Sequence, residues 1–172
     1  MPRTAAEVDV VEYQRGADGD YFLTADAGEV AALDTGAIAG WVRTGQRFHA
    51  YAAGSVLQAD QSPVCRFYGR PEAGQHSHFF SAYAEECAAI ASWLSDQWLL
   101  ESANVFVVSL PGADDGSCAP GTVPVYRLYN NAPASVGHRY TTSAAIQSQM
   151  MAAGWVAEGF GPDAVAMCAP AL

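Results

Sequence analysis

Lysine is absent from this 172-residue chain, and its eight cationic side chains are all arginines. This absence excludes every mechanism that forms a Schiff base on a lysine amine. The arginines are outnumbered by 18 Asp and Glu residues, which give a formal net charge of −10. Nucleic acids and anionic lipids are both bound through basic surfaces, so we expect neither as a partner.

Long hydrophobic runs are also missing. The longest, at residues 105–110, is far too short to cross a membrane, so we expect no membrane insertion. The first residues contain no apolar signal-peptide core, and we expect the sequence to be a mature form or one module of a longer protein. Because 51% of the residues are hydrophobic, disorder is disfavoured and a single domain with a substantial core is expected over 1–172.

Familiar motifs of catalysis and metal binding are absent as well. No GxSxG turn indicates a serine hydrolase, and no CxxC or HxxxH pair indicates zinc. Several aspartates lie in turns that complete no EF-hand, and we expect acidic turns there instead of calcium sites. These aspartates are Asp18, Asp20, Asp114, Asp115 and Asp163. The sequence therefore predicts no catalytic residues, no cofactor and no metal.

What the chain does contain is one pattern that recurs. In its clearest form, VYRLY at 125–129 precedes a polar loop, HRYTT at 138–142, a helical run and WVAEG at 155–159. Related segments occupy 64–68, 78–81 and 98–102, and more loosely 10–13, 21–24 and 41–45. Three landmarks in the same order, three times, predict a triplicated unit.

This pattern resembles a bacterial repeat family catalogued as a domain of unknown function (DUF5648), whose signature reads YRLYN…HFYTT…GW…EG. The resemblance covers nearly the whole chain, from about residue 10 to residue 170. The first copy departs from it, with Gln14 in place of an aromatic residue and Tyr21 in place of histidine. Members are often attached to secreted hydrolases and surface proteins, so the resemblance implies an extracellular or periplasmic bacterial protein.

Each copy is expected to fold as strand–loop–strand–helix–strand. One such unit cannot bury its own apolar face, so we predict an α+β domain in which three repeats share a core around a pseudo-threefold axis. The strands are expected to be short and antiparallel, and the repeats to span 9–54, 62–110 and 123–170. We expect helices at 25–34, 82–95 and 143–153, with Thr24 and Ser81 as N-caps of the first two. In the third helix, Ile146, Met150 and Met151 should be buried.

The four cysteines permit three pairings. We favour Cys65–Cys87, which ties the opening strand of the second repeat to its helix, and Cys118–Cys168, which closes the third repeat end to end. Such bridges indicate an oxidising compartment. The alternative is four reduced thiols in a cytosolic protein.

Histidines and glutamates recur at equivalent repeat positions, which favours structural roles over catalytic ones. His78 corresponds to His138, and Glu101 corresponds to Glu158. Arg66 and Arg127 are the natural partners of the two glutamates in buried ion pairs. In the first copy, Glu12 occupies the position of the arginine and Thr44 occupies the position of the glutamate.

Tyrosines beside polar loops are the best indication of a ligand. Aromatic rings flanked by amides and carboxylates suit sugars, through stacking and hydrogen bonds to hydroxyl groups. The predicted ligand-binding residues are Tyr68, His78, Tyr129, Asn130 and His138. We expect a non-catalytic secreted or surface module that binds glycan or cell-wall material. The alternatives are a structural or protein-interaction scaffold, and a hydrolase with an unfamiliar site around His76, His78 and His138. The oligomeric state is left open.

Overall fold

The computed structural model of the chain describes residues 5–16 and 19–172. Asp18, one of the aspartates expected in acidic turns, lies outside the described residues.

Short strands alternate with three α-helices along the described residues. In chain order the elements are β1 (Glu7–Arg15), β2 (Asp20–Thr24), α1 (Ala27–Asp34), β3 (Trp41–Tyr51), β4 (Gln61–Pro63), β5 (Cys65–Gly69), the 3₁₀ helix η1 (Pro71–Ala73), β6 (His78–Ser81), α2 (Ala84–Trp93), β7 (Trp98–Ser102), β8 (Val107–Ser109), β9 (Thr122–Tyr129), β10 (His138–Thr141), α3 (Ala144–Ala152), β11 (Val156–Glu158) and β12 (Val165–Pro170).

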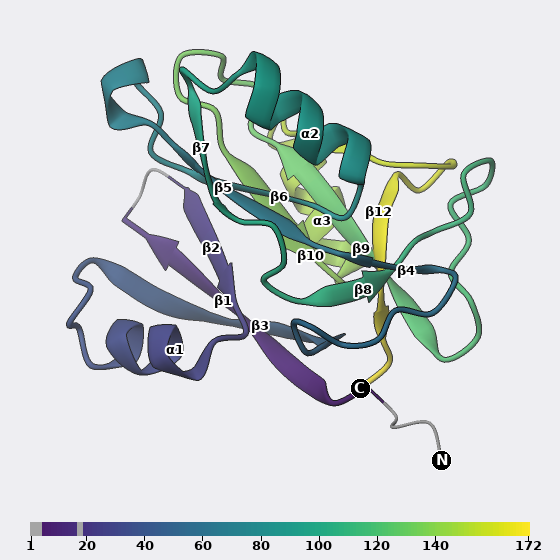
Figure 1. Cartoon of the computed structure of the whole chain (residues 1–172). Helices are drawn as coiled ribbons and strands as arrows, with labels where there is room; N and C mark the ends of the chain where they lie inside the picture. Colours follow the sequence, from purple (N-terminus) through teal and green to yellow (C-terminus); the bar gives the residue numbers. More distant parts are fainter. Residues whose placement is uncertain (1–4, 17–18) are drawn as a thin grey trace.

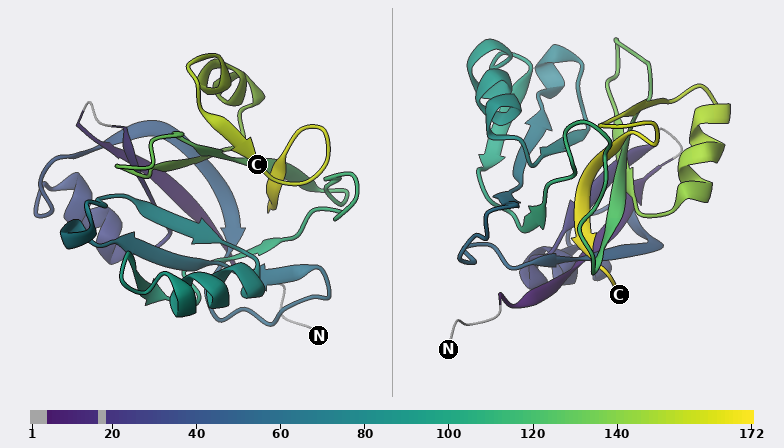
Figure 2. Two further views of the ribbon diagram at one scale, coloured as in Figure 1. Left: turned by 90° about the horizontal axis from the view of Figure 1, so that it is seen from above. Right: turned by 90° about the vertical axis from the view of Figure 1, so that its right-hand side faces the viewer.

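One arrangement of strands occurs in three places. A central strand pairs antiparallel with the next strand and with the strand that follows the helix, giving β2-β1-β3, β6-β5-β7 and β10-β9-β11. Matching positions of the three groups carry the opposed pairs Tyr13–Phe22, Phe67–Phe79 and Leu128–Arg139. In each group, one helix connects the second strand to the third. The three helices lie on different sides of the molecule (Figures 1 and 2).

The three groups are joined unequally. Strands β8 and β12 connect the first and third groups into one sheet of order β10-β9-β12-β8-β3-β1-β2, to which β11 and β4 also pair. The group β6-β5-β7 remains a separate three-stranded sheet. The fold is thus mixed α/β with antiparallel strand pairs, in agreement with the predicted class.

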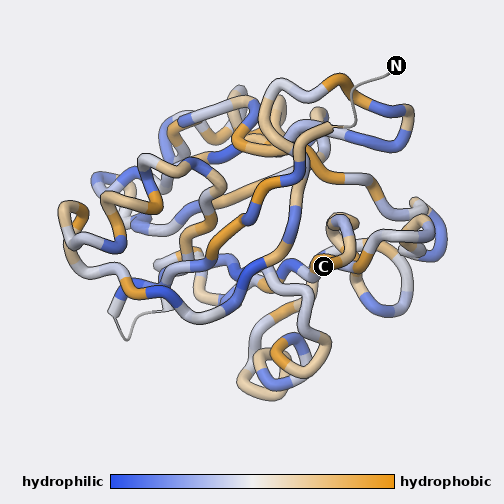
Figure 3. The backbone as a smooth tube through the Cα atoms, turned by 90° about the horizontal axis from the view of Figure 1, so that it is seen from below, coloured by the Kyte–Doolittle hydropathy of each residue, from blue (hydrophilic) through white to orange (hydrophobic). Residues whose placement is uncertain are grey.

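The largest buried cluster draws side chains from all three groups of strands. Hydrophobic stretches run along the central strands, while hydrophilic stretches gather in the peripheral loops (Figure 3). The cluster includes Val10, Leu23, Phe48, Phe80, Phe106, Val125, Tyr140 and Met167. Such a core forms only when the groups assemble, because no single group provides enough apolar surface to enclose itself.

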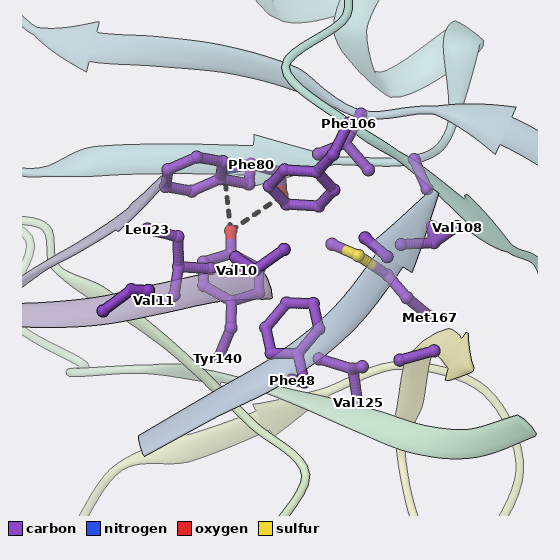
Figure 4. Packing of buried hydrophobic residues seen from close by; sticks show 14 of the residues in the cluster. Val10, Val11, Leu23, Phe48, Phe80, Phe106, Val108, Val125, Tyr140 and Met167 are labelled. Carbon is purple, nitrogen blue, oxygen red and sulfur yellow. Dashed lines mark hydrogen bonds between the residues drawn. The ribbon is translucent and has the colours of Figure 1, made fainter. Parts of the chain in front are cut away.

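Tyr140 is the polar residue at the centre of this core (Figure 4). Its hydroxyl donates to the Phe80 carbonyl oxygen at 2.7 Å and accepts from the Phe80 amide at 2.8 Å. Burial raises the pKa of the Tyr140 hydroxyl, so it stays protonated and able to make both bonds. One phenol thereby ties β10 to β6 across the core.

We predict that Tyr140→Phe lowers the free energy of unfolding by about 2 kcal/mol, because both polar groups of the Phe80 peptide lose their partner in a buried site. Chemical denaturation measures this loss. Tyr126→Phe is the control, since the Tyr126 side chain is also buried but makes no side-chain hydrogen bond among the described residues. Equal losses in the two variants would contradict the role of the Tyr140 hydroxyl.

The predicted N-caps of the first two helices were wrong by two residues. Helix α1 is capped by Asp26, whose Oδ1 accepts from the Glu29 amide at 2.8 Å, while Thr24 accepts from the Asp26 amide. Before α2, Ser81 corresponds to Thr24, and its hydroxyl accepts from the Tyr83 amide. A hydroxyl two residues before a helix forms a local turn that resembles a cap in sequence.

Helix α3 follows its prediction more closely, because Ser143 caps it by accepting from the Ile146 amide. Met150 is buried, as expected. Ile146 is only half-buried, and Met151 is 50% exposed, which corrects its predicted burial. Gln147 takes an inner position instead, where its amide donates to the Asp163 carbonyl oxygen.

Both predicted disulfides are present. Cys65 joins Cys87, which holds β5 to α2, and Cys118 joins Cys168, which holds the loop before β9 to β12. The chain has no other cysteines, so each sulfur is accounted for.

Candidate functional site

An arginine whose side chain is 12% exposed lies between the first two groups of strands. Arg66 on β5 donates to both carboxylate oxygens of Glu29 on α1, at 2.8 and 3.0 Å. Its Nε lies 2.8 Å from Glu101 on β7. The guanidinium also lies 5.1 Å from the centre of the Phe22 ring on β2. Arg66 is therefore held by residues from both groups.

Arg127 on β9 has the same surroundings between the second and third groups. It donates to Glu86 on α2 at 3.0 and 3.2 Å, and its Nε lies 2.9 Å from Glu158 on β11. The guanidinium lies 5.0 Å from the centre of the Phe79 ring on β6. The predicted pairs Arg66–Glu101 and Arg127–Glu158 are thus confirmed, while Glu29 and Glu86 were not anticipated as partners.

Between the third and first groups the charges are exchanged. Here the acid is on the central strand, as Glu12 on β1, and the arginine is Arg139 on β10. Arg139 donates to the Glu12 carboxylate at 2.9 and 3.1 Å, and the Thr44 hydroxyl donates to the same carboxylate at 2.6 Å. The Glu12 side chain is 1% exposed. The sequence identified Glu12 as anomalous but gave no indication of its partner, which lies 127 residues away.

Two histidines extend the first two of these ion-pair clusters. His78 Nε2 lies 3.5 Å from Glu101, and His138 Nε2 lies 3.4 Å from Glu158. Burial acts to raise the pKa of Glu101, but its pairing with His78 and Arg66 outweighs burial, and the pKa lies below its ordinary value. For Glu158, pairing with His138 and Arg127 outweighs burial in the same way and lowers the pKa. Both carboxylates are consequently ionised at neutral pH.

A cavity of about 280 Å³ opens beside Arg66. Aromatic, charged and aliphatic side chains all line it, and the elements β1, β2, α1, β3, β5, β6 and β7 contribute. The lining residues are Arg15, Phe22, Glu29, Leu33, Ile38, Trp41, Arg66, Tyr68, His78 and Glu101. We call this the Trp41 cavity.

Rings form a continuous wall of the Trp41 cavity. The Phe22 ring centre lies 5.7 Å from that of Trp41 and 4.6 Å from that of His78, and Tyr68 follows 5.0 Å beyond His78. Arg15 lies over Trp41, 5.1 Å from its ring centre. Trp41 and Tyr68 are only half-buried, so part of each ring is available to a ligand. The Trp41 cavity thus presents flat apolar faces beside charged groups.

The structure brings together only part of the predicted ligand-binding set. Tyr68 and His78 line the Trp41 cavity. Tyr129 and His138 lie in the third group, with ring centres 5.5 Å apart, and Asn130 holds the following loop by donating to the Ser135 carbonyl oxygen. These three residues belong to a different place on the molecule.

Trp41 and Phe22 are the aromatic residues in the lining of the Trp41 cavity that the sequence did not single out for binding. In the sequence, Trp41 marks the repeat segment 41–45. Its counterpart Trp98 is buried, at 7% exposure, against Phe79. Only the half-burial of Trp41 distinguishes the two, and no local sequence signal predicts it.

The groups of the alternative hydrolase site are not gathered into one catalytic cluster. His78 faces Glu101, His138 faces Glu158, and His76 is exposed. Over residues 5–16 and 19–172, no three His, Cys, Asp or Glu side chains form a group that could hold a metal ion. Within the same residues, no helix has the length and apolar character needed to cross a membrane.

Comparison with known proteins gives one match. The family model described as Domain of unknown function (DUF5648) matches residues 2–108 and 111–165. No curated protein and no solved structure matches the chain.

Proposed function

The chain belongs to the family described as Domain of unknown function (DUF5648), and we propose that it is a non-catalytic binding module for glycan or cell-wall material. The observation that carries this proposal is the Trp41 cavity. It combines the partly exposed rings of Trp41 and Tyr68 with the carboxylates of Glu29 and Glu101. A sugar ring stacks on the aromatic faces while its hydroxyl groups reach the charged rim.

The architecture proposed with this function is a triplicated unit around a pseudo-threefold axis. It is supported by the shared order of the three groups of strands and by their matching registers. The arginine clusters support it too, because Arg66 and Arg127 each link their own group to the preceding helix. On this proposal the position that binds glycan is the one at Trp41.

Secretion is part of the same proposal. Two disulfides favour an oxidising compartment, in which a bacterial surface module meets cell-wall polymers. The acidic charge of the chain also disfavours adsorption to other polyanions, which leaves recognition to local contacts.

A glycan array and a peptidoglycan pull-down with the oxidised protein test the proposal. We predict a specific interaction that free sugar competes away and that Trp41→Leu weakens roughly five- to thirtyfold, since an aromatic stacking platform contributes roughly 1–2 kcal/mol. The matched control is Trp93→Leu, because Trp93 is 80% exposed on α2 and lies outside the cavity. A folded protein that binds no glycan, or equal losses in both variants, would contradict the proposal.

Tyr129 and Asn130 enter the proposal as a second contact surface, and His138 is buried beside Tyr129. Tyr129 is half-buried, and its ring plane is inclined at 31° to that of His138. In the same pull-down, Tyr129→Ala weakens retention on extended polymers more than binding of short sugars. If the short sugars are affected equally, these residues do not form a separate contact surface.

A scaffold role is the second candidate, and exposed apolar residues near the end of α2 favour it. Trp93 is 80% exposed, and Leu94, Leu99 and Leu100 are 37–44% exposed nearby in sequence. Apolar surface of this kind is typical of protein contacts. Retention that depends on Trp93 and not on Trp41 would favour this role over glycan binding.

A further inference from the structure

Helix α2 begins with an unusual residue. Helices α1 and α3 are capped by Asp26 and Ser143, which accept hydrogen bonds from backbone amides, whereas α2 has Tyr83 at this position and no side-chain cap. The Tyr83 hydroxyl oxygen is itself buried, and it has no hydrogen-bond partner within the described residues. The Tyr83 side chain therefore neither caps the helix nor forms a hydrogen bond within the described residues.

Tyr83 instead lines a cavity of about 340 Å³ between α2 and the segment after β11. We call it the Tyr83 cavity. Phe160 forms its aromatic wall together with Tyr83, with ring centres 5.2 Å apart and ring planes inclined at 46°. Both rings are peculiar to this junction: the positions that match Tyr83 hold Asp26 and Ser143, and those that match Phe160 hold Gln46 within β3 and Ala103 after β7.

The charges around the Tyr83 cavity are predominantly negative. Glu85, Glu86 and Glu158 line it, and Arg127 is the cation among the lining residues. Arg127 is already engaged by Glu86 and Glu158. Glu85 is exposed and forms no ion pair within the described residues, so an excess of negative charge remains whether or not the neighbouring His138 is protonated. Burial raises the pKa of Tyr83 to about 12, which keeps its hydroxyl uncharged at neutral pH.

We propose that the Tyr83 cavity binds a small organic ammonium ion. Aromatic faces attract a cationic nitrogen through their quadrupole, and the attraction strengthens when water is excluded. Glu85 supplies the opposing charge. A hard metal ion is disfavoured, because it requires several converging oxygen ligands and two walls of this cavity are rings. This site lies apart from the Trp41 cavity, so the inference goes beyond the proposed function and stands independently of it.

An NMR titration with choline tests the inference, with the neutral isostere 3,3-dimethylbutanol as the matched ligand. We expect choline to shift the Tyr83 and Phe160 resonances until the change saturates. The isostere should cause no saturable shift of these resonances. Phe160→Leu weakens choline binding about three- to tenfold, the range expected for one cation–π contact. Glu85→Gln weakens it by a similar factor, while Glu72→Gln, the same charge change on η1, has no effect.

Three results would overturn the inference: no saturable choline shift, equal shifts with the isostere, or equal effects of Glu85→Gln and Glu72→Gln. Glu85→Gln is decisive if Phe160→Leu disturbs the fold, because Glu85 is exposed at the start of α2. Thermal denaturation of each variant establishes that the cavity is still formed. Failure here leaves glycan binding at the Trp41 cavity unaffected, because the probe contains no sugar.

Discussion

Arg139→Met is expected to lower the free energy of unfolding by about 3–5 kcal/mol, the cost of leaving a buried carboxylate without its cation. The carboxylate is that of Glu12, whose side chain is 1% exposed. Arg139 provides two of its hydrogen bonds, and Thr44 provides a third. Methionine fills most of the arginine volume beside the Tyr21 ring, so the loss reports the missing charge more than a cavity.

Urea denaturation of three variants separates these contributions. Arg47→Met is the control, because Arg47 pairs with Asp9 at the surface, where the side chains are 57% and 44% exposed, and a pair of this kind contributes less than about 1 kcal/mol. Adding Glu12→Gln to Arg139→Met should recover part of the stability, since the buried charge is then removed. If Arg139→Met costs no more than Arg47→Met, the third and first groups are not joined through this ion pair.

Replacing Cys118 and Cys168 together by alanine is expected to lower stability by about 4 kcal/mol, because the bridge spans 50 residues and restricts the unfolded chain strongly. The bridge Cys65–Cys87 spans 22 residues, and its removal should cost about 3 kcal/mol. Denaturation of the two double variants under the same conditions gives both losses.

The order of the two losses is the informative result. The Cys118–Cys168 bridge also ties the loop before β9 to β12, which lies between β9 and β8 in the large sheet. Its loss should therefore exceed that of the other bridge. A loss of less than about 1 kcal/mol for either double variant would show that the bridge does not limit the unfolded chain, contrary to the chain-entropy argument.

Local patterns in the sequence predicted most of the elements. The three helices were placed within a few residues of their observed bounds. Repetition made this possible, because a weak signal in one copy was reinforced in the next. Thr24 and Ser81 were taken as N-caps because a hydroxyl near a helix start carries the same local signal whether it caps the helix or forms the turn before it.

Contacts between distant segments were much less predictable. The sequence paired Arg66 with Glu101 and Arg127 with Glu158 within each copy, and these pairs are present. It did not indicate that Glu29 bridges to Arg66 from the preceding helix. Such contacts depend on how the groups of strands pack, and packing leaves no periodic trace in one sequence.

The same reason explains why the Trp41 cavity was predicted only in part. Tyr68 and His78 were identified from their place beside a polar loop, and both line the cavity. Trp41 occupies the same repeat position as Trp98, yet the Trp41 ring is half-buried and the Trp98 ring is buried. The difference arises from the neighbouring groups of strands, not from residues adjacent in the chain.

The most direct test of glycan binding is to follow the four tryptophan indole resonances while soluble peptidoglycan fragments and short oligosaccharides are added. Each indole N–H gives one NMR signal, and the four rings lie in different surroundings. We predict that the Trp41 signal shifts with saturation, while Trp93, Trp98 and Trp155 stay in place. A saturable shift of Trp93 alone, or no shift of any indole with every sugar tested, would contradict the assignment of the Trp41 cavity as the glycan site.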